Sequence, residues 1–467
     1  MIDGNTESRV IEDVRTAARA LPPGSRLPSV RELMARHRAS PVTVQRALSR
    51  LAGEGLVVPR PGRGTFVAER RGESVAPKAP DLGWQEVALA DRPPLDSAPL
   101  DQLLAIGPSG AIALTGGYLH PDLQPLPALG AALARAARRP EAWGRLPVEG
   151  LEPLREWFAR EAGGLVRGHD VVICSGGQPA LATTFRALAA PGEPVLVESP
   201  TYVGAIAALR AAGLRPVPVP TDEHGVRPEL LAGAFALTGA RVFYCQPLHA
   251  NPTGASLAAA RRSAVLEAVT AAGAFLIEDD WARDLRIDGD APPPLAASDP
   301  DGHVVYVRSL TKAAAPSLRV AAVSARGAAG ARLKAARIVD DFFVAGPLQH
   351  ATLELVSAPA WRRHLKTLRA GLRARRDALV AALGEHLPEW ELQTIPAGGL
   401  HVWVRLPDGL DDAALTARAA AAGVLISPGR PWFAAEPPAP HLRLTFAGAP
   451  APDLAEGVRR LAKVTHA

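Results

Sequence analysis

The chain has 467 residues, 48% of them hydrophobic and 5% aromatic, so it can bury sizeable cores and is expected to form more than one domain. Its N-terminus is polar and acidic, and no apolar run is long enough to cross a bilayer, which predicts a cytoplasmic protein with no membrane partner. Cys174 and Cys245 both lie at the ends of apolar runs. This placement favours free buried thiols over a disulfide, and no structural metal is expected.

The positive charge is concentrated at the start of the chain. The formal net charge is +5, and residues 1–70 alone hold 12 Lys and Arg against 7 Asp and Glu. A basic segment beside a neutral one suggests that the first part meets a polyanion, although a solvated basic face would have the same composition. Charge alone therefore leaves nucleic-acid binding open.

Three helices are predicted in the first 55 residues. Apolar residues near helical spacing predict a helix over residues 9–20. Ser29 and Glu32 fit a capping box, which predicts a second helix over residues 30–37. Ser40 is placed to cap a third helix, because Pro41 is tolerated at its first position.

The third helix has an inward apolar stripe and is followed by a ribbon of two strands. We expect the stripe to leave polar and basic residues on the other faces, Thr43 among them. Residues 56–60 and 65–67 read as strands joined by a basic Pro-Gly-Arg-Gly turn. The stripe consists of Val44, Ala47, Leu48 and Leu51. Helices followed by such a ribbon predict a winged helix-turn-helix.

Residues 21–67, LPPGSRLPSVRELMARHRASPVTVQRALSRLAGEGLVVPRPGRGTFV, resemble the DNA-binding domain of GntR-type bacterial transcription regulators along their whole length. The resemblance implies contact with double-stranded DNA by residues of the helices and of the wing. These are Ser29, Arg31, Thr43, Gln45, Arg46, Arg63 and Gly64. The third helix departs from many relatives by starting with Ser40-Pro41-Val42, so base readout is expected to rest more on Gln45 and Arg46; an ordinary exposed helix residue remains the alternative for Gln45.

A stretch rich in Pro, Ala and charge separates two domains. We expect a DNA-binding domain over residues 1–69, a linker over 70–109 and a second domain over 110–467. Apolar residues in the later part of the linker, such as Trp84, allow it to dock on the second domain. A smaller α+β subdomain is expected from about residue 360 to residue 467.

The second domain alternates strand-like runs with Ala-rich helical runs, which predicts an α/β fold with a mostly parallel sheet. A polar motif follows directly after each of five strand-like runs, near residues 174, 198, 245, 278 and 307. Ligands of open α/β sheets bind outside the carboxyl ends of the strands. These motifs are therefore expected to converge on one crevice.

Each motif has a possible role and an ordinary structural alternative. Gly176 and Gly177 open a helix whose free amides favour a phosphate, although many such turns are only tight turns. Asn251 and Asp279 follow strands and can face a ring hydroxyl and a ring nitrogen, whereas a turn and a helix cap are the alternatives. Lys312 follows a strand and can form a Schiff base, although a lysine in this place is often only solvated.

In their order along the chain, these motifs resemble the aspartate-type aminotransferases from about residue 114 to the C-terminus. The resemblance implies a type I fold, the cofactor pyridoxal 5′-phosphate (PLP) bound as a Schiff base to Lys312, and substrate carboxylate binding by Arg443. It implies cofactor contacts by Gly176, Gly177, Gln178, Tyr202, Asn251, Asp279, Trp281, Ser309 and Arg319. Trp281 replaces the usual tyrosine, whose hydroxyl contacts the ring oxygen; indole cannot ionise, which puts efficient transamination in doubt.

Together the two halves resemble the MocR subfamily of bacterial regulators, in which the second domain is the sensor and dimerisation unit. The hypothesis is a homodimeric, PLP-dependent transcription regulator that responds to an amino acid, an amine or PLP itself. The rival hypothesis is a working PLP-dependent aminotransferase that carries a DNA-binding module. A dimerisation scaffold with an inert pocket is the third, and the retained cofactor residues argue against it.

Overall fold

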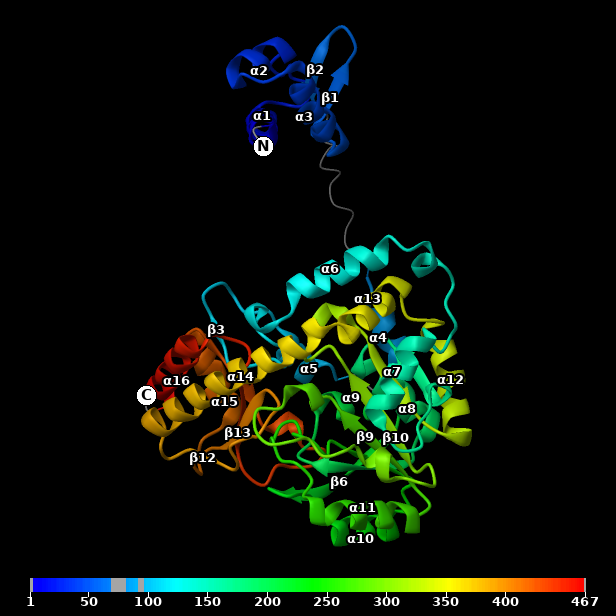
Figure 1. The fold of residues 1–467 in the computed structure, drawn as a ribbon. Helices are drawn as coiled ribbons and strands as arrows, with labels where there is room; N and C mark the ends of the chain where they lie inside the picture. The colour runs from blue at the N-terminus through cyan, green and yellow to red at the C-terminus, as the bar shows by residue number, and fades with distance from the viewer. Residues whose placement is uncertain (1–2, 69–80, 91–95, 466–467) are drawn as a thin grey trace. The chain divides into compact units, whose positions relative to one another are not determined.

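The computed structural model describes residues 3–68, 81–90 and 96–465, and the chain divides into two compact units, Met1–Pro94 and Leu95–Ala467 (Figure 1). The first unit contains three helices, a two-stranded ribbon and a short further helix. They are α1 (Asp3–Ala20), α2 (Val30–His37), α3 (Pro41–Gly53), β1 (Val57–Arg60), β2 (Gly64–Val67) and α4 (Gly83–Leu89). The predicted winged helix-turn-helix is thus confirmed.

Local capping fixes the starts of α2 and α3. The Ser29 hydroxyl accepts a hydrogen bond from the Glu32 amide at 3.3 Å, and the Glu32 carboxylate accepts one from the Ser29 amide at 2.6 Å. Ser40 caps α3 through the Thr43 amide, with Pro41 at the first helical position. Both predicted caps are present, because each depends only on residues three positions apart.

The core of the first unit is formed where α1 crosses α3. Val10, Ile11 and Val14 of α1 and the predicted apolar stripe of α3 are buried in one cluster. The ribbon pairs Val57 with Val67 and Arg60 with Gly64, so the turn between the strands carries Arg63. Val57 and Val67 at the base of the ribbon join the helical core, and the turn that carries Arg63 forms the polar tip of the wing.

The second unit is built on an eight-stranded sheet in the order β4-β11-β10-β9-β8-β5-β6-β7. Pairing is parallel from β10 through β9, β8 and β5 to β6, whereas β11 and β7 are antiparallel to their neighbours. The strands are β4 (Val171–Cys174), β5 (Pro194–Ser199), β6 (Arg215–Asp222), β7 (Gly225–Val226), β8 (Val242–Cys245), β9 (Phe275–Asp280), β10 (Val304–Ser309) and β11 (Ala321–Ser324). This arrangement confirms the predicted mostly parallel sheet.

Helices cover both faces of this sheet. Alternate strand residues fall into two buried clusters: Phe243 and Leu276 lie in one, and Tyr244 and Ile277 lie in the other. The first cluster contains residues of α7 (Glu152–Ala162), α10 (Pro228–Thr238) and α11 (Ala259–Ala271), and the second contains residues of α8 (Gly177–Leu188), α9 (Val203–Ala211) and α12 (Gly327–Asp341). Such two-sided cover explains why the strands are apolar throughout rather than alternating.

A smaller α+β part follows in the chain. Its four-stranded sheet has the order β12-β13-β16-β15, and buried residues of β13 and β16 share one apolar cluster with residues of α14 and α16 (Figure 1). Its elements are α14 (Pro359–His386), β12 (Glu391–Leu392), β13 (His401–Arg405), α15 (Asp412–Ala421), β14 (Val424–Leu425), β15 (Ser427–Pro428), β16 (His441–Thr445) and α16 (Ala451–Thr465). The predicted strands near residues 401 and 443 are both present.

The second unit also contains the following elements: α5 (Ala98–Leu104), β3 (Ile112–Ala113), α6 (Leu126–Ala137) and α13 (Gly346–Ser357). β3 pairs in parallel with β14, which ties this early segment to the small subdomain. In the part of the chain that the structure describes, no helix combines the length and apolarity needed to cross a membrane.

The predicted linker, residues 70–109, is only partly within the described residues. Residues 69–80 and 91–95 lie outside them, whereas α4 and α5 lie inside. In α4, Trp84, Val87 and Leu89 are exposed. In contrast, Leu100 and Leu103 of α5 are partly buried and pack against a buried cluster of the second unit, to which α5 belongs.

Candidate functional site

The polar motifs that follow five strands of the large sheet meet in one cavity of about 280 Å³ in the second unit. They come from the carboxyl ends of β4, β5, β8, β9 and β10, as the strand-end rule predicts. The predicted residues that line the cavity are Gly177, Gln178, Tyr202, Asn251, Asp279, Trp281, Ser309, Lys312, Arg319 and Arg443. Gly176 is the remaining one, and it lies directly beneath Arg319.

Lys312 lies in the turn after β10, with its amine held inside the cavity. Nζ donates a hydrogen bond to the Gly117 carbonyl oxygen at 2.8 Å and lies 3.9 Å from the centre of the Tyr118 ring. Burial, reinforced by the positive charges of Arg443 and Arg319, lowers the pKa of the Lys312 amine to about 7. A large share of this amine is therefore neutral near pH 7, and a neutral amine is a nucleophile.

An anion-binding cradle lies at the start of α8. Gly176 has a φ of 103°, and a Cβ at this position would lie 2.3 Å from Nη2 of Arg319, so only glycine lets the guanidinium lie here. The first turn of α8 begins at Gly177 and has no side-chain cap, which leaves its amides for a ligand. Ser309 and Thr311 add two hydroxyls, which bond each other. The arrangement fits a phosphate group.

Asp279, at the end of β9, is the buried carboxylate of the cavity. Its Oδ2 accepts hydrogen bonds from the Tyr244 hydroxyl at 2.7 Å and from Nε2 of Gln246 at 2.8 Å. Burial raises the pKa of Asp279 to about 6, against the lowering effect of these two bonds. A cation beside this carboxylate would offset the free-energy cost of burying its negative charge. Asp279 is therefore suited to a protonated ring nitrogen.

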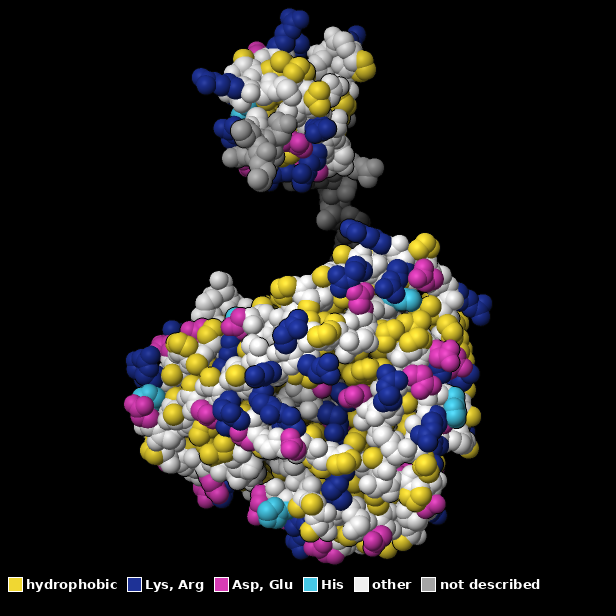
Figure 2. All heavy atoms as spheres, in the orientation of Figure 1, with side chains coloured by type: hydrophobic (Ala, Val, Ile, Leu, Met, Phe, Trp, Pro, Cys, Tyr) yellow, Lys and Arg dark blue, Asp and Glu magenta, His cyan; other side chains and the backbone are white. Residues whose placement is uncertain are grey.

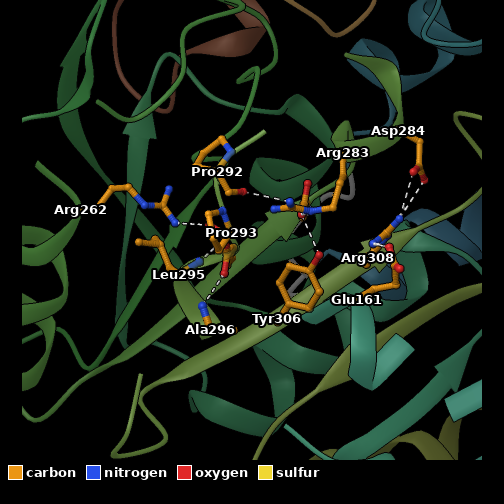
Figure 3. Close-up of polar contacts among 12 residues, drawn as sticks. Glu161, Arg262, Arg283, Asp284, Pro292, Pro293, Leu295, Ala296, Tyr306 and Arg308 are labelled. Atoms are coloured by element: carbon orange, nitrogen blue, oxygen red, sulfur yellow. Dashed lines mark hydrogen bonds and ion pairs between the residues drawn. The ribbon is translucent and has the colours of Figure 1, made fainter. Parts of the chain in front are cut away.

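A network of buried ion pairs on β9 and β10 holds the strand ends that carry Asp279 and Lys312. Arg308 of β10 lies between Glu161 and Asp284, at 2.6 and 3.1 Å (Figure 3). Asp280 accepts hydrogen bonds from the Tyr306 hydroxyl, at 2.7 Å, and from Arg283. The Tyr306–Asp280 bond joins β10 to β9, and Arg308 links β10 to α7 and to the segment after β9, so these contacts fix the two strand ends relative to each other.

Arg443 of β16 supplies a buried cation to the cavity. It is 0% exposed, and its Nη2 donates to the Gly116 carbonyl oxygen at 2.6 Å. Its Nη1 lies 3.3 Å from Oδ1 of Asn251, and its guanidinium lies 4.4 Å from the centre of the Trp432 ring. Burial lowers the pKa of Arg443 to about 9, and its Nε has no hydrogen-bond partner among the described residues. A carboxylate would supply the missing counter-charge.

Trp281 occupies the side of the cavity next to His401. The indole is 8% exposed, and its ring centre lies 5.9 Å from that of His401. Its Nε1 is buried and has no hydrogen-bond partner in the described part of the chain. The indole can donate one hydrogen bond to a ligand there but cannot accept one.

The structure adds cavity residues that the motifs did not identify. Gln246 was visible as the first residue after β8, the position that the strand-end rule selects. Thr311 directly precedes Lys312 in the same motif. Leu181 lies one turn into α8, the helix that Gly177 starts. The others come from loops and strands far apart in sequence or from the predicted linker, where no local pattern marks them. Besides Gln246, the added residues are Leu100, Leu103, Leu104, Gly117, Tyr118, Leu181, Thr311 and His401.

In the first unit, most of the predicted DNA contacts lie at the surface. Arg31, Gln45, Arg46 and Arg63 are exposed, and Gly64 begins β2 with a φ of 106°. Figure 2 shows Lys and Arg side chains spread over this unit. The exposed basic side chains of this unit can therefore bind a polyanion such as DNA.

Thr43 is a correction to the predicted outward face of α3. It is only 6% exposed, and its hydroxyl lies 2.8 Å from the hydroxyl of Ser40. The prediction that Thr43 points outward was wrong, because its side chain is buried and its hydroxyl bonds the hydroxyl of the N-cap residue Ser40. Ser29, half-buried, is likewise engaged in capping α2.

Two further arginines extend the exposed basic surface near the wing. The Arg26 guanidinium would lie 3.2 Å from a Cβ at Gly64, so it lies against the start of β2. The Arg60 guanidinium lies 4.8 Å from the Phe66 ring centre. Cation–π contact and close backbone approach hold both side chains beside the turn that carries Arg63.

The geometry defines a type I PLP-dependent aminotransferase fold joined to a DNA-binding winged helix. Comparison with known families gives the same result. Residues 115–461 match the model of aminotransferase class I and II, and residues 6–67 match that of bacterial regulatory proteins of the gntR family. The chain belongs to the class I and II aminotransferase family and carries a GntR-type domain at its N-terminus.

Relatives with the same two-part organisation and relatives of the second unit alone are both found. The uncharacterized HTH-type transcriptional regulator YdfD of Bacillus subtilis is 28% identical over 94% of this chain and 92% of its own length. The vitamin B6 salvage pathway transcriptional repressor PtsJ of Salmonella typhimurium is 30% identical over 96% and 95%. These matches are consistent with the MocR subfamily.

Among solved structures, the second unit is similar to LysN, the α-aminoadipate aminotransferase of Thermus thermophilus, in complex with N-(5′-phosphopyridoxyl)-L-leucine. The TM-score is 0.75, and the two chains are 32% identical over 82% of this chain and 98% of that one. The cofactor of this fold is PLP, and the residues present fit it: the glycine at position 176 keeps the anion cradle open, and Asp279 and Arg443 are buried charges that a ligand would neutralise.

Proposed function

We propose that the chain is a PLP-dependent transcription regulator whose aminotransferase-like domain senses an amino acid, an amine or PLP. The observation that carries the proposal is the meeting of Lys312, Asp279 and the α8 cradle in one cavity, in a chain whose N-terminal unit is a GntR-type winged helix. As a DNA-binding regulator of the GntR type, the protein is proposed to act in the cytoplasm.

Each proposed cofactor contact follows from the chemistry of its group. The first amides of α8, with Ser309 and Arg319, would hold the phosphate of PLP. Asp279 would pair with the ring nitrogen, Asn251 with the ring hydroxyl, and Tyr202 would contact the ring; all three line the cavity. PLP supplies a carbonyl group that reacts with amines and a ring that withdraws electrons. Lys312 supplies the amine that holds it.

For the effector, Arg443 is the proposed carboxylate anchor. Its guanidinium is buried beside Asn251, and its Nε has no hydrogen-bond partner in the described part of the chain, so a carboxylate would gain charge-assisted hydrogen bonds there. Lys312, which would hold PLP, lies in the same cavity, so the amine of an effector anchored at Arg443 would lie near the cofactor. An amino acid therefore satisfies both groups at once.

The proposed output is a change of DNA affinity. In the first unit, Arg31, Gln45 and Arg46 on the helices, and Arg63 with Gly64 on the wing, are proposed to contact the operator. The proposed boundaries are a DNA-binding domain over residues 1–69, a linker over 70–109 and a sensor domain over 110–467. A homodimer would present two winged helices to two half-sites.

A second candidate function is a working aminotransferase that carries a DNA-binding module. It is favoured by the retention of Lys312, Asp279 and Arg443 in one cavity. It is opposed by Trp281, because indole cannot accept a proton where related enzymes carry a tyrosine hydroxyl. Sustained turnover of an amino acid with 2-oxoglutarate would favour this candidate over the regulator.

The proposed function is tested by fluorescence anisotropy with the DNA upstream of the protein's own gene. Purified protein is titrated with and without PLP at fixed salt, against a scrambled duplex, because affinity for DNA depends strongly on salt. We expect preferential binding to the upstream DNA and a shift of that affinity with PLP. Equal affinity for both duplexes, in protein shown to hold PLP, would contradict the regulator and favour the enzyme.

A further inference from the structure

One wall of the cofactor cavity is apolar and comes from a short helix outside the large sheet. Three leucines of α5, Leu100, Leu103 and Leu104, line the cavity together with Leu181 of α8. The polar residues of α5, Asp101 and Gln102, are both exposed, so the helix presents its apolar side to the cavity. A cavity that otherwise binds charged groups therefore has one apolar wall.

Packing holds α5 in this position. Leu100 and Leu103 pack against a buried cluster of Val203, Trp432 and other aromatic residues. At the N-terminal end of α5, the Ser97 hydroxyl donates to Asp101 at 2.8 Å. Leu104 is different, because it lines the cavity while 59% of its surface is exposed. An exposed leucine at a cavity rim gains stability from any apolar group that covers it.

The apolar wall is close to the proposed carboxylate anchor. Trp432 belongs to the cluster that carries Leu100 and Leu103, and the same indole lies under the Arg443 guanidinium at 4.4 Å. A ligand whose carboxylate is held by Arg443 therefore has the leucine wall as a near neighbour.

The charged groups of the cavity are already matched to the cofactor and to one carboxylate. Among the described residues that line it, the Asp, Glu, Lys and Arg side chains are Asp279, Lys312, Arg319 and Arg443. In the proposed site, Asp279 would pair with the ring nitrogen of PLP and Arg319 with its phosphate. Lys312 would bond the carbonyl group of PLP, and Arg443 would bind the carboxylate of the effector. A second charge on the ligand would meet leucine side chains, and an unpaired charge at an apolar wall is unfavourable.

We propose that the effector is an α-amino acid with an apolar, uncharged side chain of about the size of leucine, and that α5 selects it. The inference rests on the proposed function, because it assumes that PLP and the effector share this cavity. The carboxylate binds Arg443, the amine reaches the cofactor, and the side chain covers Leu103 and Leu104.

The proposal is tested by isothermal titration calorimetry of the full chain loaded with PLP. L-Leucine, L-alanine, L-glutamate and L-lysine are compared at one pH and salt concentration. Each fully buried methylene raises affinity roughly fourfold. Since Leu104 is exposed at the rim, burial is incomplete, and we expect leucine to bind about tenfold more tightly than alanine, with glutamate and lysine weaker than leucine.

Variants of exposed leucines separate the wall from general effects on folding. Leu104→Ala removes a side chain that is 59% exposed, so the fold is expected to tolerate it. We expect this change to lower the leucine-to-alanine affinity ratio about threefold. The matched control is Leu237→Ala on α10, where the side chain is 88% exposed and does not line the cavity, and where both affinities should stay unchanged.

The outcomes distinguish the two proposals. Tighter binding of glutamate or lysine than leucine, or an unchanged ratio in Leu104→Ala, would overturn the apolar effector while leaving the PLP-dependent sensor intact. Failure of all four amino acids to bind a chain that holds PLP would also overturn it. Failure to hold PLP would overturn the proposed function itself.

Discussion

The two functional surfaces of this chain place their charges in opposite environments. On the winged helix, Arg31, Arg46 and Arg63 are exposed. In the cofactor cavity, Asp279 and Arg443 are buried. Burial raises the pKa of Asp279 and lowers that of Arg443, so it favours the neutral form of each. Exposed charges bind a polyanion by many small, salt-dependent contributions. Buried charges are costly when unpaired, so they favour one ligand that neutralises them.

This contrast predicts different responses to mutation. A change at the DNA surface should reduce affinity in part and evenly across sequences, since phosphate contacts add up. A change in the cavity should remove one specific step, since each buried group has one role. The following predictions range from the largest expected effect to the smallest.

Replacing Lys312 should have the largest effect. Lys312→Ala removes the amine that bonds Gly117 and that is proposed to hold PLP, so we expect the absorbance of covalently attached cofactor to disappear. Affinity for the upstream DNA without PLP should stay within about twofold of the wild type, because Lys312 belongs to the second unit and the proposed DNA-binding residues belong to the first. Lys312→Arg is the control, since it keeps a long basic side chain but forms no Schiff base. Covalent cofactor in the alanine variant would exclude Lys312 as its anchor.

Arg443→Ala should weaken amino-acid binding about tenfold to a hundredfold, because hydrogen bonds to charged groups contribute about 1.5–3 kcal/mol. Calorimetry on PLP-loaded protein measures this effect. PLP should remain bound, since Lys312 and Arg319 are unchanged. Arg443→Lys is the control that keeps a charge but loses the forked geometry, so it should restore part of the affinity. Unaltered binding of leucine to Arg443→Ala would place the carboxylate elsewhere.

The pKa of Lys312 predicts how cofactor capture depends on pH. Burial depresses this pKa from its usual value near 10.5 to about 7, so the neutral amine becomes the main form above pH 7. The rate of PLP attachment to cofactor-free protein should rise about tenfold from pH 6 to pH 8 and then level off, measured by stopped-flow absorbance. A rise that continues to pH 10 would mean that the amine has an ordinary pKa.

The same shift predicts a change in the stability of the cofactor-free protein. Between about pH 7 and pH 10.5 the unfolded chain keeps the Lys312 proton that the folded chain has lost, so the unfolded state binds more protons. The contribution of Lys312 to the free energy of unfolding should therefore increase with pH through this window. Lys312→Met, which cannot titrate, should abolish that part of the pH dependence in denaturant melts.

On the winged helix, Arg63→Ala should raise the dissociation constant for upstream DNA only severalfold and reduce the slope of log K against log salt by about 1. Arg46→Ala should also relax sequence preference if it reads a base. Arg19→Ala, at the exposed end of α1, is the matched control and should leave affinity nearly unchanged. An equal loss in all three variants would contradict the assignment of the wing.

The smallest expected effect belongs to Trp281. Trp281→Tyr supplies a hydroxyl that can ionise where the indole has an unpaired Nε1, so we expect amino-group transfer to 2-oxoglutarate to increase severalfold with little change in PLP content. A coupled assay of amino-group transfer and the absorbance of the cofactor measure the two quantities. No increase would show that Trp281 does not limit transfer.

Features that depend on neighbouring residues were predictable from the sequence. The capping box of α2, the start of α3 at Pro41 and the wing turn all involve residues within four positions of each other. The cavity was predictable for a different reason, because a parallel sheet brings the carboxyl ends of its strands together. Ten of the predicted residues therefore line one cavity, although they are spread from residue 177 to residue 443.

Features that depend on packing between distant segments were not predictable. Thr43 points inward because its hydroxyl bonds that of Ser40 at the N-cap of α3, a contact that the helical pattern alone did not show. The leucines of α5 stood in a Pro-rich stretch that was interpreted as a linker, and only their contacts with Trp432 and its neighbours place them at the cavity. Tyr118 reaches Lys312 across nearly 200 positions of sequence, with no motif to mark it.

The measurement that tests the central claim most directly is the response of operator binding to the effector, in the wild type and in Lys312→Ala. Anisotropy with upstream DNA is recorded with PLP present, with and without saturating L-leucine, at one salt concentration. We predict a change of DNA affinity in the wild type and none in Lys312→Ala, because differential binding at that lysine is what shifts the equilibrium. The same response in both proteins would contradict the coupling of the cofactor cavity to DNA binding.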